Sequence, residues 1–470
     1  MERVQAREPA VRPAEQAPPA ERPGRLKRFV AFFRAEKTPE KTREERMKEA
    51  ETEQEKETGL LRRMVDKLSG EEYLYDRRLE LQKAERAALE KLWGEPAVAV
   101  IYHSHNSGST KHDYTGSPDG LFTLDTEVPG GEYRPKLSTL LEAMGIDAIF
   151  VTDHDADKFK GLDSALADLN AKERHISFFG GTEMTSDEGH FIVLETGRRL
   201  GESSVPIPPA KTPAVEVAEW AFREGYDIMI PHPNPSRNTL GSQVERKAFG
   251  IDIGIERETA KEILELARRY GRFVYIAYAN GTTLADYKDH LLGKKRHWWQ
   301  FRLNPPVDSR TVELYRERAV WIAEADGHIK CEYPSNMVYF RRSAVVDEKT
   351  GKVSVAKISD VVARQKEAEL EAWAEAKGVD VKDAALHPYS ADGGFRMRDK
   401  FYLLPYFVRE YARLIGVWVV AVATGKAKQY AAKPKRSPES QYRRLTYTQE
   451  QERTRAAEEA ARSARPRAAV

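Results

Sequence analysis

Histidine is the most informative residue type in this sequence, because its placement indicates metal chemistry. All eleven histidines lie between residues 103 and 387, and six of them stand at the ends of predicted strands. His103 and His105 end the apolar run AVAVIYHSH. Two residues apart on a strand, they point to the same face, where both imidazoles could reach one metal ion. Such pairs also arise by chance, so the pair needs further ligands to define a site.

Acidic residues and further histidines follow at corresponding places along the chain. Each has an ordinary explanation: Asp119 precedes a glycine, as in turns, His154 lies between two aspartates, as in a capped loop, and His232 precedes a proline. The other candidates, which by themselves could be turns or a strand edge, are Glu183, His190, Asp326 and His328. Together with the first pair they form a mixed nitrogen and oxygen set, which suits two or three divalent ions such as Zn, Mn or Fe.

The elements that must hold these residues begin near residue 97. Apolar, β-branched runs alternate from there with helical segments, a pattern typical of a βα barrel or a doubly wound sheet. The later predicted strands are 148–152, 176–179, 191–194, 228–230, 273–277 and 319–323, and helices are predicted at 135–144, 214–224 and 258–270. Strand ends of a barrel converge on one mouth, and metals clustered there can clamp a phosphoryl group. The sequence therefore predicts hydrolysis of phosphate esters.

The motifs HxH, DG, TDH, GxE, a strand-associated His, HP and DxH occur in this order over residues 97–335 and resemble the PHP (polymerase and histidinol phosphatase) family. The resemblance implies an α/β fold, a distorted (β/α)7 barrel around a trinuclear site. It also implies two or three ions among Zn, Mn, Fe and Mg, with a bridging water or hydroxide that attacks phosphorus. The metal ligands that it implies are His103, His105, Asp119, His154, Glu183, His190, His232, Asp326 and His328.

Two alternatives to this ligand set remain open. The stretch between His105 and Asp119 is longer than is usual in the family, so His112 or Asp113 could take the place of Asp119. His387, which precedes a proline, competes as a ligand from beyond the last expected strand.

We predict Glu183, His232 and Arg237 as catalytic residues. Arg237 follows His232 closely, and its planar guanidinium can orient a phosphate by binding two oxygens at once. Residues 294–302, KKRHWWQFR, combine cations with aromatic rings, which can stack bases and track phosphates. This segment is either a lid packed on the barrel or a clamp for the substrate.

Composition divides the rest of the chain. The 76 basic and 74 acidic side chains leave a net charge of +2, so no global field attracts nucleic acid or membrane. Both ends are locally basic, with eight Lys or Arg against four Glu before residue 35 and ten against five after residue 430, and could contact nucleic acid. The predicted domains are a disordered basic, proline-rich arm (1–34), a charged helical region (35–94), the PHP-like barrel (95–335), a C-terminal α/β extension (336–430) and a disordered basic tail (431–470).

Several classes of protein are excluded or disfavoured. A single cysteine, Cys331, forms no internal disulfide and rules out a zinc site built on several thiolates. The sequence has no GxGxxG or GxxxxGK[ST] loop, which argues against dinucleotide binding and P-loop chemistry. The N-terminus lacks an apolar signal segment, and the most apolar stretch, residues 414–423, is too short to span a bilayer. We therefore expect a cytoplasmic protein without a membrane partner.

The favoured function is a metal-dependent phosphoesterase acting on a phosphomonoester, a nucleotide or a nucleic-acid end. The alternative is a nucleic-acid or protein binding, scaffolding protein whose PHP-like barrel holds a structural metal. Hydrolysis of another bond, such as C–N, is a third option, because metal-assisted hydrolysis is not exclusive to phosphorus. The sequence defines no oligomeric state.

Overall fold

The structure is a computed structural model of the chain. It divides into residues 1–45 and 46–470, and the fold below is that of the second unit together with residues 43–45, which begin its first helix. Several predicted features lie outside the described residues: the arm, the basic tail, residues 294–302 and 414–423, His112, Asp113, Asp119 and Arg237. The described residues are 42–57, 70–106, 124, 136–154, 162–173, 175–186, 188–196, 207–209, 212–233, 254–255, 257–280, 291–292, 307–374, 380–395, 399, 402, 404–406 and 408.

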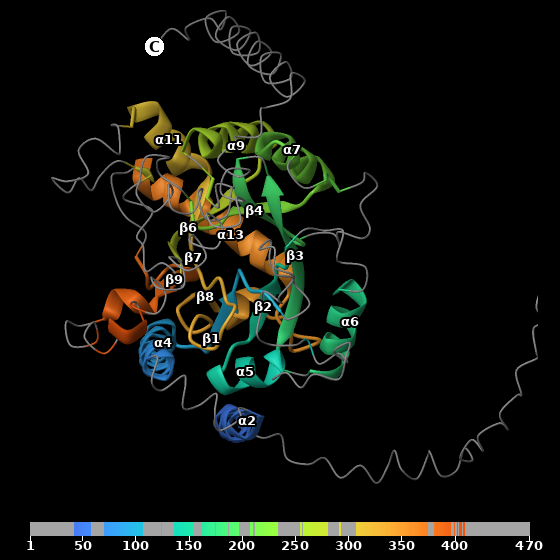
Figure 1. The fold of residues 1–470 in the computed structure, drawn as a ribbon. Helices are drawn as coiled ribbons and strands as arrows, with labels where there is room; N and C mark the ends of the chain where they lie inside the picture. The colour runs from blue at the N-terminus through green and yellow to red at the C-terminus, as the bar shows by residue number, and fades with distance from the viewer. Residues whose placement is uncertain are drawn as a thin grey trace, which may run out of the picture. The chain divides into compact units, whose positions relative to one another are not determined.

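A nine-stranded sheet forms the centre of the described fold (Figure 1). Hydrogen bonds join its strands in the order β7-β6-β5-β4-β3-β2-β1-β8-β9. The pairs β1–β2, β2–β3, β5–β6 and β6–β7 are parallel, and the other four are antiparallel. The strands are β1 (Ala97–Ile101), β2 (Ala148–Val151), β3 (Ser177–Ser186), β4 (Gly189–Leu194), β5 (Asp227–Ile230), β6 (Val274–Asn280), β7 (Ala319–Glu324), β8 (Asn336–Arg341) and β9 (Leu386–Ser390).

Helices alternate with these strands along much of the chain. Some of their ends have a clear local cause: α4 and α7 stop at glycines in the left-handed conformation, Gly94 and Gly225, and Asp308 caps α11 by accepting from the Thr311 N–H at 2.8 Å. The described helices are α2 (Arg43–Glu57), α4 (Glu71–Trp93), α5 (Leu137–Met144), α6 (Leu162–Lys172), α7 (Ala214–Glu224), α9 (Arg257–Arg269), α11 (Ser309–Arg318), α12 (Arg342–Val345), α13 (Val355–Ala374) and the 3-10 turn η3 (Ala391–Gly394).

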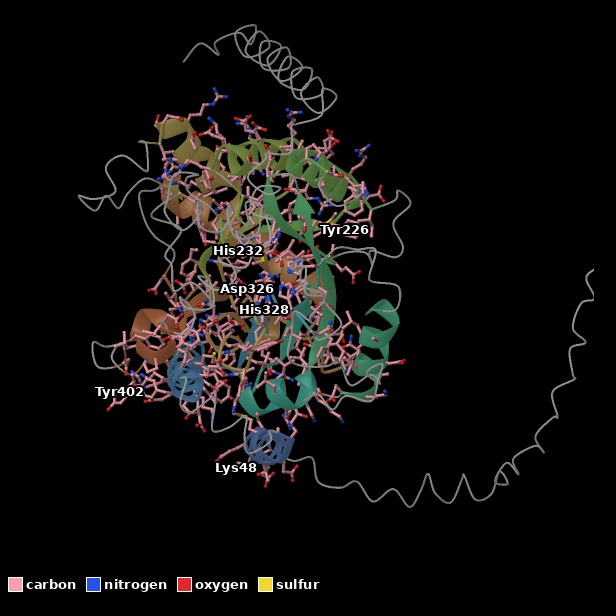
Figure 2. The ribbon with its side chains drawn as sticks, viewed as in Figure 1. Lys48, Tyr226, His232, Asp326, His328 and Tyr402 are labelled. Carbon is pink, nitrogen blue, oxygen red and sulfur yellow. The ribbon has the colours of Figure 1, made fainter. Side chains whose placement is uncertain are left out.

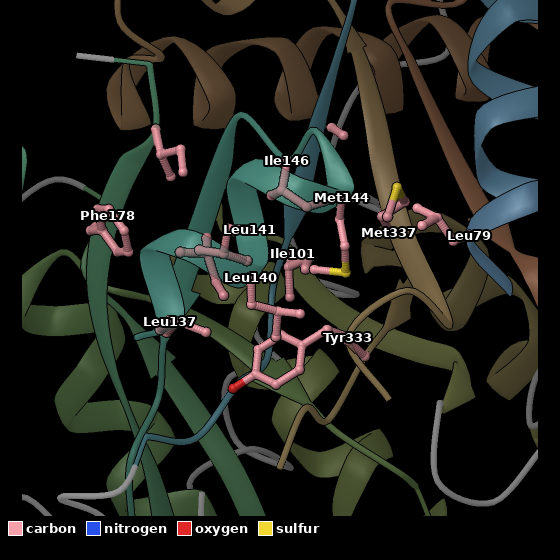
Figure 3. Close-up of a cluster of buried hydrophobic side chains, with 14 of the residues drawn as sticks. Leu79, Ile101, Leu137, Leu140, Leu141, Met144, Ile146, Phe178, Tyr333 and Met337 are labelled. Atoms are coloured by element: carbon pink, nitrogen blue, oxygen red, sulfur yellow. The ribbon is translucent and has the colours of Figure 1, made fainter. Parts of the chain in front are cut away.

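Alternation along the strands divides the core between the two faces of the sheet. On β1, Val98 and Val100 join a cluster with residues of α12 and α13, whereas Ala99 and Ile101 face α4 and α5. Figure 3 shows the second cluster, in which leucines of α5 pack toward Ile101. A third cluster packs α7, α9 and α11 against the later strands, and these helices lie together in Figure 1. Helices thus cover the sheet and leave its strand ends for the polar residues.

The two edges of the sheet approach one another, so that the sheet is a nearly closed, barrel-like structure. Asn336 Nδ2 of β8 donates to the Glu324 carbonyl of β7 at 2.8 Å, and the Tyr278 hydroxyl of β6 donates to the Pro388 carbonyl of β9 at 3.3 Å. The expected α/β class and barrel are confirmed at this level. The sheet itself has nine described strands and mixed directions, whereas the family resemblance implied (β/α)7.

The extra strands come from the segment predicted as a C-terminal extension. β8 pairs with β1, and β9 pairs with β8, both antiparallel. The strand β4 runs antiparallel to both of its neighbours, β3 and β5. Among the described helices, none combines the length and apolar character that crossing a bilayer requires.

Candidate metal centre

Eight of the nine predicted ligands are described, and all eight come from strand ends or from strands β3 and β4. His103 and His105 follow β1, and His154 follows β2. Glu183 lies in β3, opposite His154 in an isolated parallel bridge, and His190 is the second residue of β4. His232 follows β5, and Asp326 and His328 follow β7; Figure 2 shows these three close together near the middle of the folded unit.

The carboxylate of Glu183 is the centre of the cluster, and it is 1% exposed. Five imidazoles surround it, and they come from four different segments of the chain, because His103 and His105 both follow β1. Its Oε2 lies 3.2 Å from His103 Nε2, 3.1 Å from His105 Nε2 and 3.4 Å from His154 Nδ1. Its Oε1 lies 2.9 Å from His190 Nδ1 and 3.3 Å from His232 Nε2. The barrel thus brings one acid and five histidines to a single buried point.

Asp326 is the centre of a second focus, a carboxylate close to several histidine nitrogens, beside the first focus at Glu183. Its Oδ1 lies 3.6 Å from His103 Nε2, 3.7 Å from His105 Nε2 and 3.6 Å from His328 Nδ1. The His105 and His328 rings stack with centroids 4.4 Å apart, so their nitrogens share one region. His103 and His105 are therefore shared between the two foci.

The donor set fits divalent metal ions. Four overlapping triads have ligand atoms that all lie within 4.8 Å of one another: His103/His232/Asp326, His103/His105/Glu183, His105/Asp326/His328 and His154/Glu183/His190. His103 Nε2 and His105 Nε2 are only 2.9 Å apart, so both aim at the same point. His232 Nδ1 is buried and has no hydrogen-bond partner within the described part of the chain, which is unusual for a buried polar atom. Nitrogen and oxygen ligands of this mix suit Zn, Mn or Fe.

The charges of the cluster strongly perturb its pKa values. Burial raises the pKa of Glu183, but the charges of His154, His190 and His103 outweigh it and hold that pKa well below its ordinary value. Burial lowers the pKa of His232, but the hydrogen bond to Glu183 and the charges of nearby acids raise it to about 9. The metal-free cluster therefore holds protons that incoming cations must displace.

Burial and charge act in the same opposed way on His103 and Asp326. Burial lowers the pKa of His103, but the charges of Asp326 and Glu183 raise it well above its ordinary value. Burial raises the pKa of Asp326, but the charges of His103 and other histidines hold it below its ordinary value. Acid and histidine thus stabilise each other's charged forms.

Backbone strain is concentrated at this site. His232, with φ of 26°, and Asp326, with φ of 50°, are the only non-glycine residues with positive φ among those described. This conformation is costly for such residues and persists only where the surroundings enforce it. Here the His232 N–H donates to Glu324 Oε1 at 2.6 Å, which fixes the turn after β5.

Two acids that orient the ligands were not predicted from the sequence. Glu324 is fully buried at the end of β7, and its Oε2 lies 2.9 Å from His103 Nδ1. Glu332 accepts from the N–H groups of His328 and Ile329 at 2.8 and 3.1 Å. A carboxylate that holds one ring nitrogen leaves the other free to bind metal. The signal for Glu324 was an acid ending the otherwise apolar strand AVWIAE.

The competing candidate His387 lies apart from the cluster. It belongs to β9, and its Nε2 pairs with Glu85 Oε1 of α4 at 3.0 Å. Its side chain is 25% exposed, and no described metal-ligand group includes it.

Comparisons with known proteins give a limited match. No family model matches the chain, and no curated protein matches it. One solved structure that the chain matches is a provisionally assigned metal-dependent phosphoesterase from Bifidobacterium adolescentis. It has a TM-score of 0.26 and 12% sequence identity, and the match covers 50% of this chain and 90% of that one.

Proposed function

We propose that the protein is a metal-dependent phosphoesterase of the PHP type. The observation that carries the proposal is the buried cluster in which Glu183 and Asp326 are surrounded by six histidines. Structural residues have no reason to converge in this way, because buried charges are expensive unless they pair or bind metal. Bound divalent ions would supply Lewis acidity and would lower the pKa of water.

The residues of the site would have three roles: to bind metal, to orient the ligands and to bind the phosphate. The eight described ligands, with Asp119 as the proposed ninth, would hold two or three ions among Zn, Mn, Fe and Mg. Glu183 is the centre of the first focus, His232 lies near both Glu183 and Asp326, and both residues would bind at the reacting centre, while Glu324 orients His103 and the backbone of His232. Arg237 would bind the oxygens of the phosphate, as a guanidinium can.

We propose a phosphomonoester, a nucleotide or a nucleic-acid end as the substrate class. Ions clustered in a site clamp phosphoryl oxygens effectively, which favours phosphorus over other centres. The basic and aromatic segment 294–302 and the basic chain ends would favour a nucleic-acid substrate over a small one.

Hydrolysis assays test this proposal. Purified protein with added Mn²⁺ is incubated with a chromogenic phosphomonoester and with a short single-stranded oligonucleotide, with and without chelator. The wild type and His387→Ala should turn over at least one substrate, whereas Glu183→Gln and His103→Ala should lose that activity. His387→Ala is the matched control, since that histidine lies outside the cluster. Full activity in chelator or in both site variants would refute the proposal, and bound metal without turnover would favour the scaffolding alternative.

A further inference from the structure

The segment between β7 and β8, residues 325–335, carries two of the candidate ligands and is hydrogen-bonded to residues 103–105, which follow β1. The His105 N–H donates to the Gly327 carbonyl at 2.9 Å, and the Gly327 N–H donates to the His103 carbonyl at 3.3 Å. The Tyr333 hydroxyl donates to the His105 carbonyl at 2.9 Å. These bonds set the distance between residues 325–335 and the two histidines after β1. They do not connect residues 325–335 to any element outside the barrel.

Helix α4, which precedes the barrel in the sequence, provides that outer anchor. Arg78 Nη1 donates to the Cys331 carbonyl at 2.7 Å, and Gln82 Nε2 donates to the Pro334 carbonyl at 2.5 Å. Lys330 Nζ lies 4.1 Å from the centre of the Tyr75 ring, a cation–π contact. Positions 75, 78 and 82 are three and four residues apart, so one face of α4 makes all three contacts.

Arg78 is the most constrained of these residues, because its side chain is fully buried. Its Nε and Nη2 donate to the two carboxylate oxygens of Asp392, each at 2.8 Å, while Nη1 holds the Cys331 carbonyl. A guanidinium that is hydrogen-bonded to a carboxylate and to a carbonyl at once has little freedom to move, because its donors are fixed in one plane. Arg78 therefore fixes the position of residues 325–335 relative to α4 and to η3.

We propose that α4 positions the segment that carries Asp326 and His328 and thereby sets the affinity for the metal ion bound by His105, Asp326 and His328. The inference rests on the proposed metal centre, and it assigns a positioning role to a helix outside the barrel. Arg78 and Gln82 donate to backbone carbonyls of this segment. They act through the backbone of residues 331 and 334, only a few residues from His328.

The test is a titration of chelator-treated full-length protein with Co²⁺, followed by visible absorption and by elemental analysis. Arg78→Met alone would leave Asp392 buried and unpaired, so the first variant is the double replacement Arg78→Met with Asp392→Leu. The second is Gln82→Met, which removes only the bond to Pro334. The control is Arg77→Met on the same helix, because Arg77 pairs with Glu80 and Asp399 and not with the segment.

We expect one equivalent of Co²⁺ to bind about 10- to 100-fold more weakly in both test variants, as for the loss of other groups that support ligands. The remaining equivalents, and the whole titration of Arg77→Met, should match the wild type. Unchanged binding of every equivalent in Gln82→Met, or an equal weakening of all equivalents, would overturn the inference. A wild type that binds no Co²⁺ would instead overturn the proposed function, and this inference with it.

Discussion

Glu324→Gln tests whether a buried acid behind the ligands controls metal binding. Glu324 accepts from two donors at once, with Oε2 2.9 Å from His103 Nδ1 and Oε1 2.6 Å from the His232 N–H. The first bond keeps the proton of neutral His103 on Nδ1, so that Nε2 presents its lone pair to a metal. The substitution keeps the shape of the side chain but leaves it one accepting oxygen.

The size of the effect follows from this geometry. If the new amide nitrogen faces His103, it favours the tautomer that carries its proton on Nε2, the atom aimed at Glu183. If it turns the other way, two N–H donors meet at His232. Either arrangement costs about 1–3 kcal/mol for a buried unpaired group. We therefore expect metal to bind about 5- to 150-fold more weakly.

The assay is a competition titration with Zn²⁺ and a chelator of known affinity. The control is Glu80→Gln, since Glu80 is 68% exposed and pairs with Arg77 on the surface of α4, away from the cluster. A dissociation constant equal to that of the wild type in Glu324→Gln would refute the orienting role of this acid.

Three further predictions concern protons and packing. His232 has a pKa raised from 6.5 to about 9, so the stability that its charged form contributes to the metal-free protein is complete below pH 6.5 and lost as pH rises through about 9. Glu183 has a pKa held well below 4.5, so the stability that its charged form contributes is present above pH 4.5 and lost on acidification. Thermal unfolding in chelator should therefore show the highest stability between the pH ranges in which Glu183 and His232 titrate. A flat pH profile would contradict both assignments. Metal affinity should rise with pH over the range in which His232 loses its proton, and calorimetry in buffers of different ionisation enthalpy should detect protons released on binding. In Gly327→Ala the added Cβ would lie 3.0 Å from the Tyr333 ring. We therefore expect a loss of about 1–3 kcal/mol in unfolding free energy and weaker metal binding. Wild-type values for both quantities would disprove the close packing.

Much of the barrel could be predicted because its strands are short apolar runs. The seven runs identified in the sequence each overlap one of the strands β1 to β7. Strand direction could not be predicted in this way, because a run such as Phe191–Leu194 reads the same in parallel and antiparallel pairs. The pairing of β8 with β1 joins residues more than 200 positions apart, and local patterning carries no information about it.

The candidate site was predictable to the extent that its ligands are chemically distinctive. Histidines are rare enough that their recurrence at strand ends carried the hypothesis. The supporting residues are less distinctive: Glu324 and Arg78 belong to types that are common on surfaces, and only the structure shows them buried. The positive φ of His232 and of Asp326 is likewise visible only in the structure, because most Asp and His residues have negative φ.

Anomalous diffraction from crystals of the wild type grown with Mn²⁺ or Zn²⁺ tests the central claim most directly. We predict two or three anomalous peaks within the cluster around Glu183 and Asp326, with histidine nitrogens about 2.0–2.1 Å from zinc. A difference map without peaks between these side chains, in crystals that hold the metal elsewhere, would contradict the claim that they form a multinuclear metal centre.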